Sequence, residues 1–134
     1  MKKFLKSLVA VMLVCLMAVS FTSCGISDDP AKVKANLEKE GYKVLLADDA
    51  ISTGVIAEAY GLKAGDIVAS LTATNGDETI SIVFCGNGDA AKTVKDKMQE
   101  QIDKMDEEDK KDLKWGKSGK AVYMGTAAAV KAAK

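Results

Sequence analysis

Hydrophobic and polar positions alternate most regularly between Asp66 and Cys85. Asn75-Gly76 lies between the two alternating runs, which is the strongest short-range signal of a β-hairpin. A loop of these two residues gives the apolar pairs Leu71–Ile80, Ala69–Ile82 and Ile67–Phe84 and the hydroxyl pairs Thr72–Thr79 and Ser70–Ser81. These apolar pairs share one face, and Val68 and Val83 oppose each other on the hydroxyl face as an exception. We therefore expect a core on that face, and an opposite face that is wet or lies under something polar.

Three other segments have the spacing of apolar residues that is typical of amphipathic helices, and a fourth, the last, is predicted helical from its cap and its Ala-rich side. Each follows a residue suited to the helix N-cap, namely Asp29, Thr53, Asp89 or Thr126. Pro30 suits the first helical position, and Gly41 suits the end of the first helix. The predicted helices are 29–40, 53–60, 89 to about 109, and 127–133.

The remaining strands are predicted at 42–47, 113–115 and 120–124, the last two forming a hairpin around the loop 116–119. The resulting order is α-β-α-β-β-α-β-β-α. Hairpins separated by helices indicate the α+β class. We expect a single small domain with a mainly antiparallel sheet and helices packed on one face.

The first residues have the order of a secretory signal peptide: a basic head with Lys2, Lys3 and Lys6, then an apolar run from Leu8 to Val19. This run has 12 residues, fewer than the roughly 20 that cross a bilayer as a helix. An uncleaved anchor and an ordinary signal peptide with an incidental cysteine are the alternatives.

Phe21-Thr22-Ser23-Cys24 resembles the lipobox of bacterial lipoproteins, although Leu is usual where Phe21 stands. The resemblance implies a diacylglyceryl group on the Cys24 thiol and cleavage just before Cys24. We therefore expect a signal peptide at 1–23, a lipidated tether at 24–28 and the domain at 29–134. The protein would be anchored to the bacterial cell membrane or outer membrane through its lipid, facing outside the cytoplasm.

Composition narrows the chemistry of the mature chain. Without its first 23 residues the chain of 134 keeps 111, with 16 lysines against 19 acidic residues, a net charge of −3. This balance does not indicate nucleic acid as a partner. The chain has no His and no Arg, so histidine-based nucleophile pairs, the usual zinc sites and bidentate anion clamps are excluded. We expect no cofactor and no metal.

Cysteine usage leaves one thiol in the mature domain. Cys15 leaves with the signal peptide and Cys24 carries the lipid, so Cys85 has no partner for an internal disulfide. A buried apolar role in a strand is the favoured interpretation, and a reactive thiol is the alternative.

Two classes of function remain. The favoured one is a non-catalytic binding or structural domain whose ligand is an envelope protein or a glycan. Its candidate surfaces are the wet sheet face, the loops 86–88 and 116–119, and the aromatic residues Tyr60, Trp115 and Tyr123. The alternative is a small envelope hydrolase that pairs Asp48 or Asp49 with Glu58, and a cleft with two converging carboxylates would support it.

Overall fold

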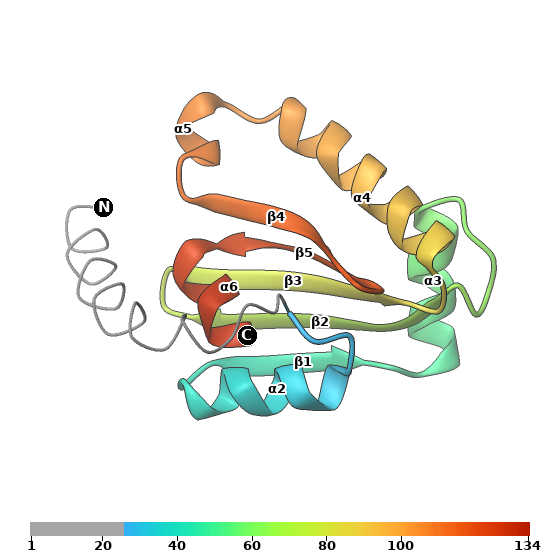
Figure 1. Cartoon of the computed structure of the whole chain (residues 1–134), viewed down its shortest axis with the longest axis horizontal. Coiled ribbons are helices and arrows are strands. Elements are labelled where there is room, and N and C mark those ends of the chain that lie inside the picture. The colour runs from blue at the N-terminus through green and yellow to red at the C-terminus, as the bar shows by residue number, and fades with distance from the viewer. Residues whose placement is uncertain (1–25) are drawn as a thin grey trace.

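A computed structural model describes residues 26–134 and confirms the α+β class and the predicted order of elements, with one short helix added (Figure 1). The sheet is antiparallel throughout, with strand order β1-β2-β3-β5-β4. The elements are α2 (Pro30–Lys39), β1 (Lys43–Ala47), α3 (Ala50–Ala59), β2 (Ile67–Asn75), β3 (Glu78–Cys85), α4 (Gly88–Asp103), α5 (Glu107–Lys110), β4 (Leu113–Ser118), β5 (Ala121–Thr126) and α6 (Ala127–Ala133).

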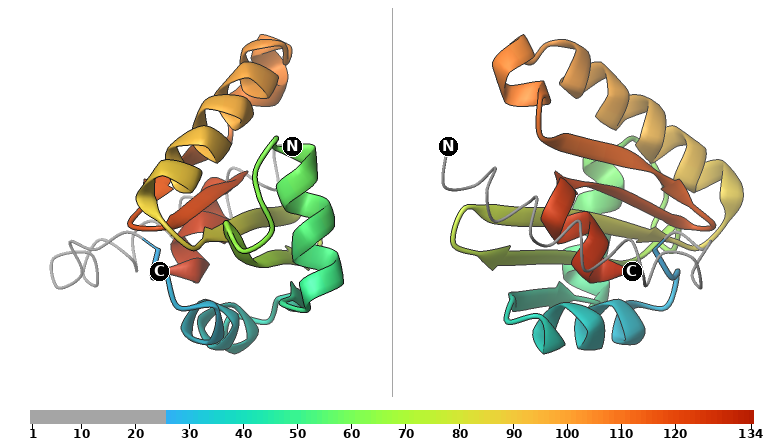
Figure 2. Two further views of the ribbon diagram at one scale, coloured as in Figure 1. Left: turned by 90° about the vertical axis from the view of Figure 1, so that its right-hand side faces the viewer. Right: turned by 60° about the vertical axis from the view of Figure 1, so that its left-hand side comes forward.

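Helices lie against both faces of the sheet, so the expectation of helices on one face was wrong. On the first face, α2 and α6 cover a core that includes Leu71, Ile82 and Phe84. On the second face, α4 and α3 cover a core that includes Val83 and Val122. Figure 2 shows α6 and α3 on opposite sides of the sheet. The physical reason is that the end of β3 and the middle of β5 are apolar on both sides and need cover on both.

The predicted register of the first hairpin was wrong by two residues. Leu71 pairs with Ile82, and Thr72 pairs with Ser81. The loop is Gly76-Asp77 instead of Asn75-Gly76, with Gly76 at φ +61°. Glycine at the first loop position is the pattern of a type II′ turn. Because a shift of two preserves the alternation, Ala69, Leu71 and their partners still share the first face and the hydroxyls the other. The predicted Ile67–Phe84 pair was wrong for a second reason: a bulge between Ile67 and Ala69 pairs Ile67 with Cys85 and places Ile67 in the core of the second face.

The second hairpin is longer than predicted. β4 reaches Ser118 and β5 begins at Ala121, so the loop is Gly119-Lys120. Residues 116–118, predicted to lie in an exposed loop, therefore belong to a strand. Gly116 pairs with Tyr123, and a Cβ at Gly116 would lie 3.0 Å from the Tyr123 hydroxyl oxygen. The close approach of this ring explains why a glycine can continue the strand here.

Asp29 caps α2 as predicted, since its carboxylate accepts a hydrogen bond from the Ala31 N–H at 3.0 Å. Two other predicted caps were wrong by two to four residues. The cap of α3 is Asp49 instead of Thr53, and the cap of α4 is Asn87 instead of Asp89. In both cases an earlier Asx side chain reaches the free N–H groups first.

The predicted long helix after Asp89 also ends early, at Asp103. The acidic run from Asp106 to Asp109 instead begins the separate helix α5, with Asp106 at its N-cap. Negative side chains are unfavourable at the C-terminus of a helix and favourable in a first turn. The break between the two helices therefore moves this charge from an unfavourable end to a favourable one.

The predicted tether is not loose over its described part. Ile26 has only 2 % of its surface exposed and belongs to the core of the first face. Its carbonyl oxygen accepts a hydrogen bond from the Ser118 hydroxyl at 2.6 Å. The core therefore includes an apolar side chain three residues before the domain boundary predicted at residue 29. The signal peptide and Cys24 lie outside the described residues.

Candidate groove between α3 and α4

An open groove of about 520 Å³ lies on the second face of the sheet, between α3 and α4. Its floor is formed by β2 and β3, and one wall is formed by each helix. The lining residues are Val55, Ile56, Ala59, Tyr60, Ser70, Thr72, Ser81, Val83, Lys97, Glu100, Gln101 and Lys104.

The floor carries hydroxyl groups because of the strand period. Ser70 and Thr72 alternate along β2 with the buried Ala69 and Leu71, so they point to the second face. Ser81 lies beside Thr72 in the ladder. This is the face that the sequence predicted to be wet or covered by something polar, and the groove leaves these three hydroxyls accessible.

The α3 wall is apolar on its outer side as well as its inner side. Ala57 is buried against the sheet, yet Val55 and Ile51 are 64 % and 81 % exposed. These two residues are four apart and therefore share one side of the helix. Ser52 and the exposed Glu58 interrupt the apolar surface of this helix. Two exposed aliphatic residues on one side of a helix are nevertheless unusual, because apolar helix faces are normally buried.

A third exposed aliphatic residue adjoins the groove from the edge strand. Leu45 in β1 is 77 % exposed and pairs with the floor residue Thr72, so both side chains lie on the second face. We call Leu45, Ile51 and Val55 the apolar rim. The large exposed apolar residues of 26–134 are these three and Val68 in β2, so all four fall between positions 45 and 68.

The α4 wall is polar and carries both signs of charge. Lys97, Glu100, Gln101 and Lys104 line the groove from the last turns of this helix. All three charged side chains are exposed, so this wall is a mixed, solvated edge. Mixed charges of this kind set the orientation of a ligand more than its affinity.

The three predicted aromatic residues do not form one surface. Tyr60 lines the groove at the end of α3, and burial raises the pKa of its phenol. Trp115 packs against the same core, where its indole N–H donates to the Gln99 side chain at 2.7 Å. Tyr123 packs on the opposite face. Only Tyr60 of the three is available to a ligand in the groove.

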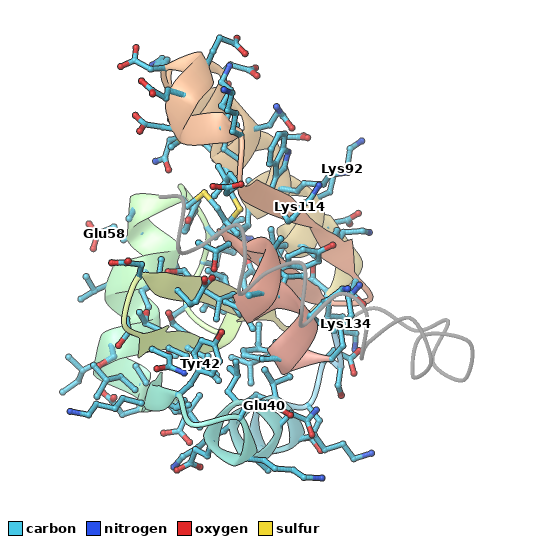
Figure 3. All side chains as sticks on the ribbon, turned by 90° about the vertical axis from the view of Figure 1, so that its left-hand side faces the viewer. Glu40, Tyr42, Glu58, Lys92, Lys114 and Lys134 are labelled. Carbon is cyan, nitrogen blue, oxygen red and sulfur yellow. The ribbon has the colours of Figure 1, made fainter. Side chains whose placement is uncertain are left out.

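The carboxylates of the alternative hydrolase are not brought together. Asp49 accepts a hydrogen bond from the Ser52 N–H at 2.9 Å, and this bond lowers its pKa. Glu58 lies nine residues further along the same helix, an axial separation of roughly 13 Å. Figure 3 shows Glu58 pointing away from the body of the domain. Asp48 is exposed beside the cap. No pair of converging carboxylates therefore arises from these three residues.

Cys85 occupies the buried position that the sequence favoured. It is the last residue of β3 and packs in the core of the second face. Burial raises the pKa of its thiol to about 11, and the nearby Asp66 carboxylate adds to the rise. Little thiolate is present near neutral pH, so this side chain acts as a small apolar residue.

A second open cavity, of about 660 Å³, lies on the other side of the molecule where the described chain begins. The residues that line it are Ile26, Ser27, Asp28, Lys32, Ala35, Asn36, Ser118, Gly119 and Lys134. The carboxylate of Asp28 lies against Gly119. This surface combines two exposed lysines with polar backbone and side-chain groups.

Comparison of the chain with protein-family models, with curated proteins and with solved structures gave no match. Among residues 26–134 no helix has the length and apolar character needed to cross a membrane. The same residues contain no group of three or more side chains suited to holding a metal ion.

Proposed function

We propose that this chain is a bacterial lipoprotein, anchored through lipid on Cys24, and that its domain outside the cytoplasm is a non-catalytic binding module. We further propose that the groove between α3 and α4 receives an apolar segment of another envelope protein. The observation that carries the proposal is the apolar rim: three aliphatic side chains that remain exposed beside a hydroxyl-lined groove.

Exposed aliphatic residues that gather on one side of a small domain are typical of an interaction site. Ile51 and Val55 lie on one side of α3, and Leu45 adjoins the floor of the same groove. The floor hydroxyls can donate to, and accept from, the backbone of a bound segment, while the rim contacts its apolar side chains. This combination favours a protein segment over a glycan. Sugars stack on aromatic rings, and Tyr60 is the single aromatic residue that lines the groove.

The groove is tested by site-specific photo-crosslinking in cells that make the full chain. A photoreactive side chain at Val55 should give a defined crosslinked product, whereas the same group at the exposed Glu38 on α2 should not. Excess purified wild-type domain should suppress the product, and the Val55→Lys domain should fail to do so. Equal products from both positions, or equal competition by both domains, would contradict a site in the groove.

The lipid anchor is tested separately by the intact mass of the protein isolated from membranes. The expected species begins at Cys24 and carries two or three acyl chains, because one chain gives only marginal membrane binding. Cys24→Ala should leave an uncut precursor or release the protein. A mature-sized Cys24→Ala protein that still sediments with membranes would refute the anchor.

A further inference from the structure

The point at which the described chain enters the domain is rigid. Ile26 is buried in the core of the first face, and its carbonyl oxygen accepts from the Ser118 hydroxyl at 2.6 Å. Asp29 then accepts from the Ala31 N–H and begins α2. The chain is thus fixed to the fold from Ile26 onward, and no free spacer separates this residue from the first helix.

Only one residue, Gly25, lies between Ile26 and Cys24. Each residue of an extended chain spans at most about 3.6 Å, so the Cα atom of Cys24 stays within about 7 Å of that of Ile26. A domain of about 100 residues has a radius of gyration of about 13 Å. A tether shorter than the radius of the body that it holds does not let that body turn freely.

We propose that the domain lies directly on the bilayer that holds the acyl chains of Cys24, with the cavity around Ile26 facing the lipid headgroups. This inference rests on the lipid anchor proposed above. The headgroup layer of one leaflet is about 5–7 Å thick, which matches the reach of the tether. The surface around Ile26 therefore meets headgroups as soon as the acyl chains enter the hydrocarbon.

The chemistry of this surface suits phospholipid headgroups. Lys32 and Lys134 line the cavity and are exposed, and Asp28 is the acidic residue among its lining side chains. Lysine side chains near a membrane surface are attracted to anionic lipid phosphates. Asn36 and Ser118 add uncharged polar groups. The large exposed apolar residues of 26–134 lie elsewhere, at positions 45 to 68.

The groove then opens away from the membrane. Ile26 belongs to the first face of the sheet, and the hydroxyl floor belongs to the second. Figure 2 shows the C-terminus and α3 on opposite sides of the sheet, and Figure 3 shows Lys134 and the α3 residue Glu58 on opposite sides of the domain. The sheet thus separates the membrane contact from the binding groove.

Lysine footprinting of the lipidated protein tests this orientation. The full mature protein is placed in vesicles of phosphatidylethanolamine and phosphatidylglycerol and treated with an amine-reactive reagent, and each lysine is read by mass spectrometry. Relative to the same protein in detergent, Lys32 and Lys134 should react several-fold more slowly. Lys97 and Lys104, on the groove wall, should react at an unchanged rate.

The matched control lengthens the tether and leaves the domain intact. A flexible Gly-Ser insertion of about 10 residues between Gly25 and Ile26 has a mean span of about 18 Å. This variant should remain bound to vesicles while Lys32 and Lys134 lose their protection. Protection that persists in this variant would overturn the argument from tether length.

The two proposals fail in distinguishable ways. A protein that carries no acyl chains and does not float with vesicles refutes the lipid anchor. A lipidated protein that floats, but whose Lys32 and Lys134 react as fast in vesicles as in detergent, overturns the orientation and leaves the anchor standing.

Discussion

Replacing Ile26 by alanine tests whether the start of the domain belongs to its core. The side chain is 2 % exposed and packs with the first-face core beneath α2 and α6. The substitution removes three carbon groups, worth about 0.8 kcal/mol each in transfer free energy, and leaves a cavity. We expect a loss of about 3 kcal/mol in the free energy of unfolding. For a domain of this size that corresponds to a fall of about 15 °C in Tm.

The assay is urea unfolding of the chain from Gly25 onward, followed by the fluorescence of Trp115. The matched control is Ile51→Ala, because the same side chain is removed at a position that is 81 % exposed. The control should change the unfolding free energy by less than about 0.5 kcal/mol. If the two variants unfold at the same urea concentration, Ile26 is not part of the core. The short tether, and with it the proposed orientation on the membrane, would then be refuted.

Three further predictions concern the sheet and its titrating groups. A Cβ at Gly125 would lie 2.6 Å from the Thr79 carbonyl oxygen, while helical Gly54 has nothing within 4 Å. Gly125→Ala should therefore lower the free energy of unfolding by more than about 2 kcal/mol, and Gly54→Ala should raise it by about 0.5–1 kcal/mol. A thermal unfolding experiment in which Gly125→Ala is not the less stable variant would contradict this packing. Because burial raises the pKa of Cys85 to about 11, iodoacetamide should alkylate the native protein near neutral pH far more slowly than the protein in urea, and equal rates would refute burial. Burial also raises the pKa of Tyr42 from 10.0 to about 12. The stability that this shift contributes is fully present below pH 10 and is lost as the pH rises through about 12. The free energy of unfolding, measured by urea titration, should therefore fall less steeply with pH above 10 in Tyr42→Phe than in the wild type. An equal fall in both proteins would contradict the burial of Tyr42.

Local patterns predicted the element types because each depends on neighbouring residues. Asp29-Pro30 specified the start of α2, and the alternation along β2 specified which side chains face the first core. The prediction of the hairpin register was wrong for a local reason too. Asn75-Gly76 and Gly76-Asp77 are both favourable two-residue turns, and the alternation alone cannot choose between registers that differ by two.

The groove could not be predicted in full because it depends on the spacing of two distant helices. The hydroxyls of Ser70 and Thr72 did indicate a wet face, and Tyr60 was among the proposed ligand contacts. Val55 lies within the helix predicted at 53–60, but its exposure depends on how far α3 lies from α4 across the sheet. The same limit applies to Ile26, whose burial requires α2 and α6 to meet over one face.

The two faces of the sheet support different contacts because β2 differs on its two sides. Its alanine and leucine side chains are covered on the first face, where the buried Ala129 and Ala133 of α6 are small enough to allow close packing. Its hydroxyl side chains remain uncovered on the second face. If the bilayer contacts the domain on the first face of the sheet and a partner protein binds on the second face, the two contacts do not compete. Insertion of a linker before Ile26 should then change the lysine footprint without changing the crosslink from Val55. Val55→Lys should do the reverse: as a competitor it should fail to suppress that crosslink, while Lys32 and Lys134 of the lipidated variant should keep their protection, because distant and independent sites act additively.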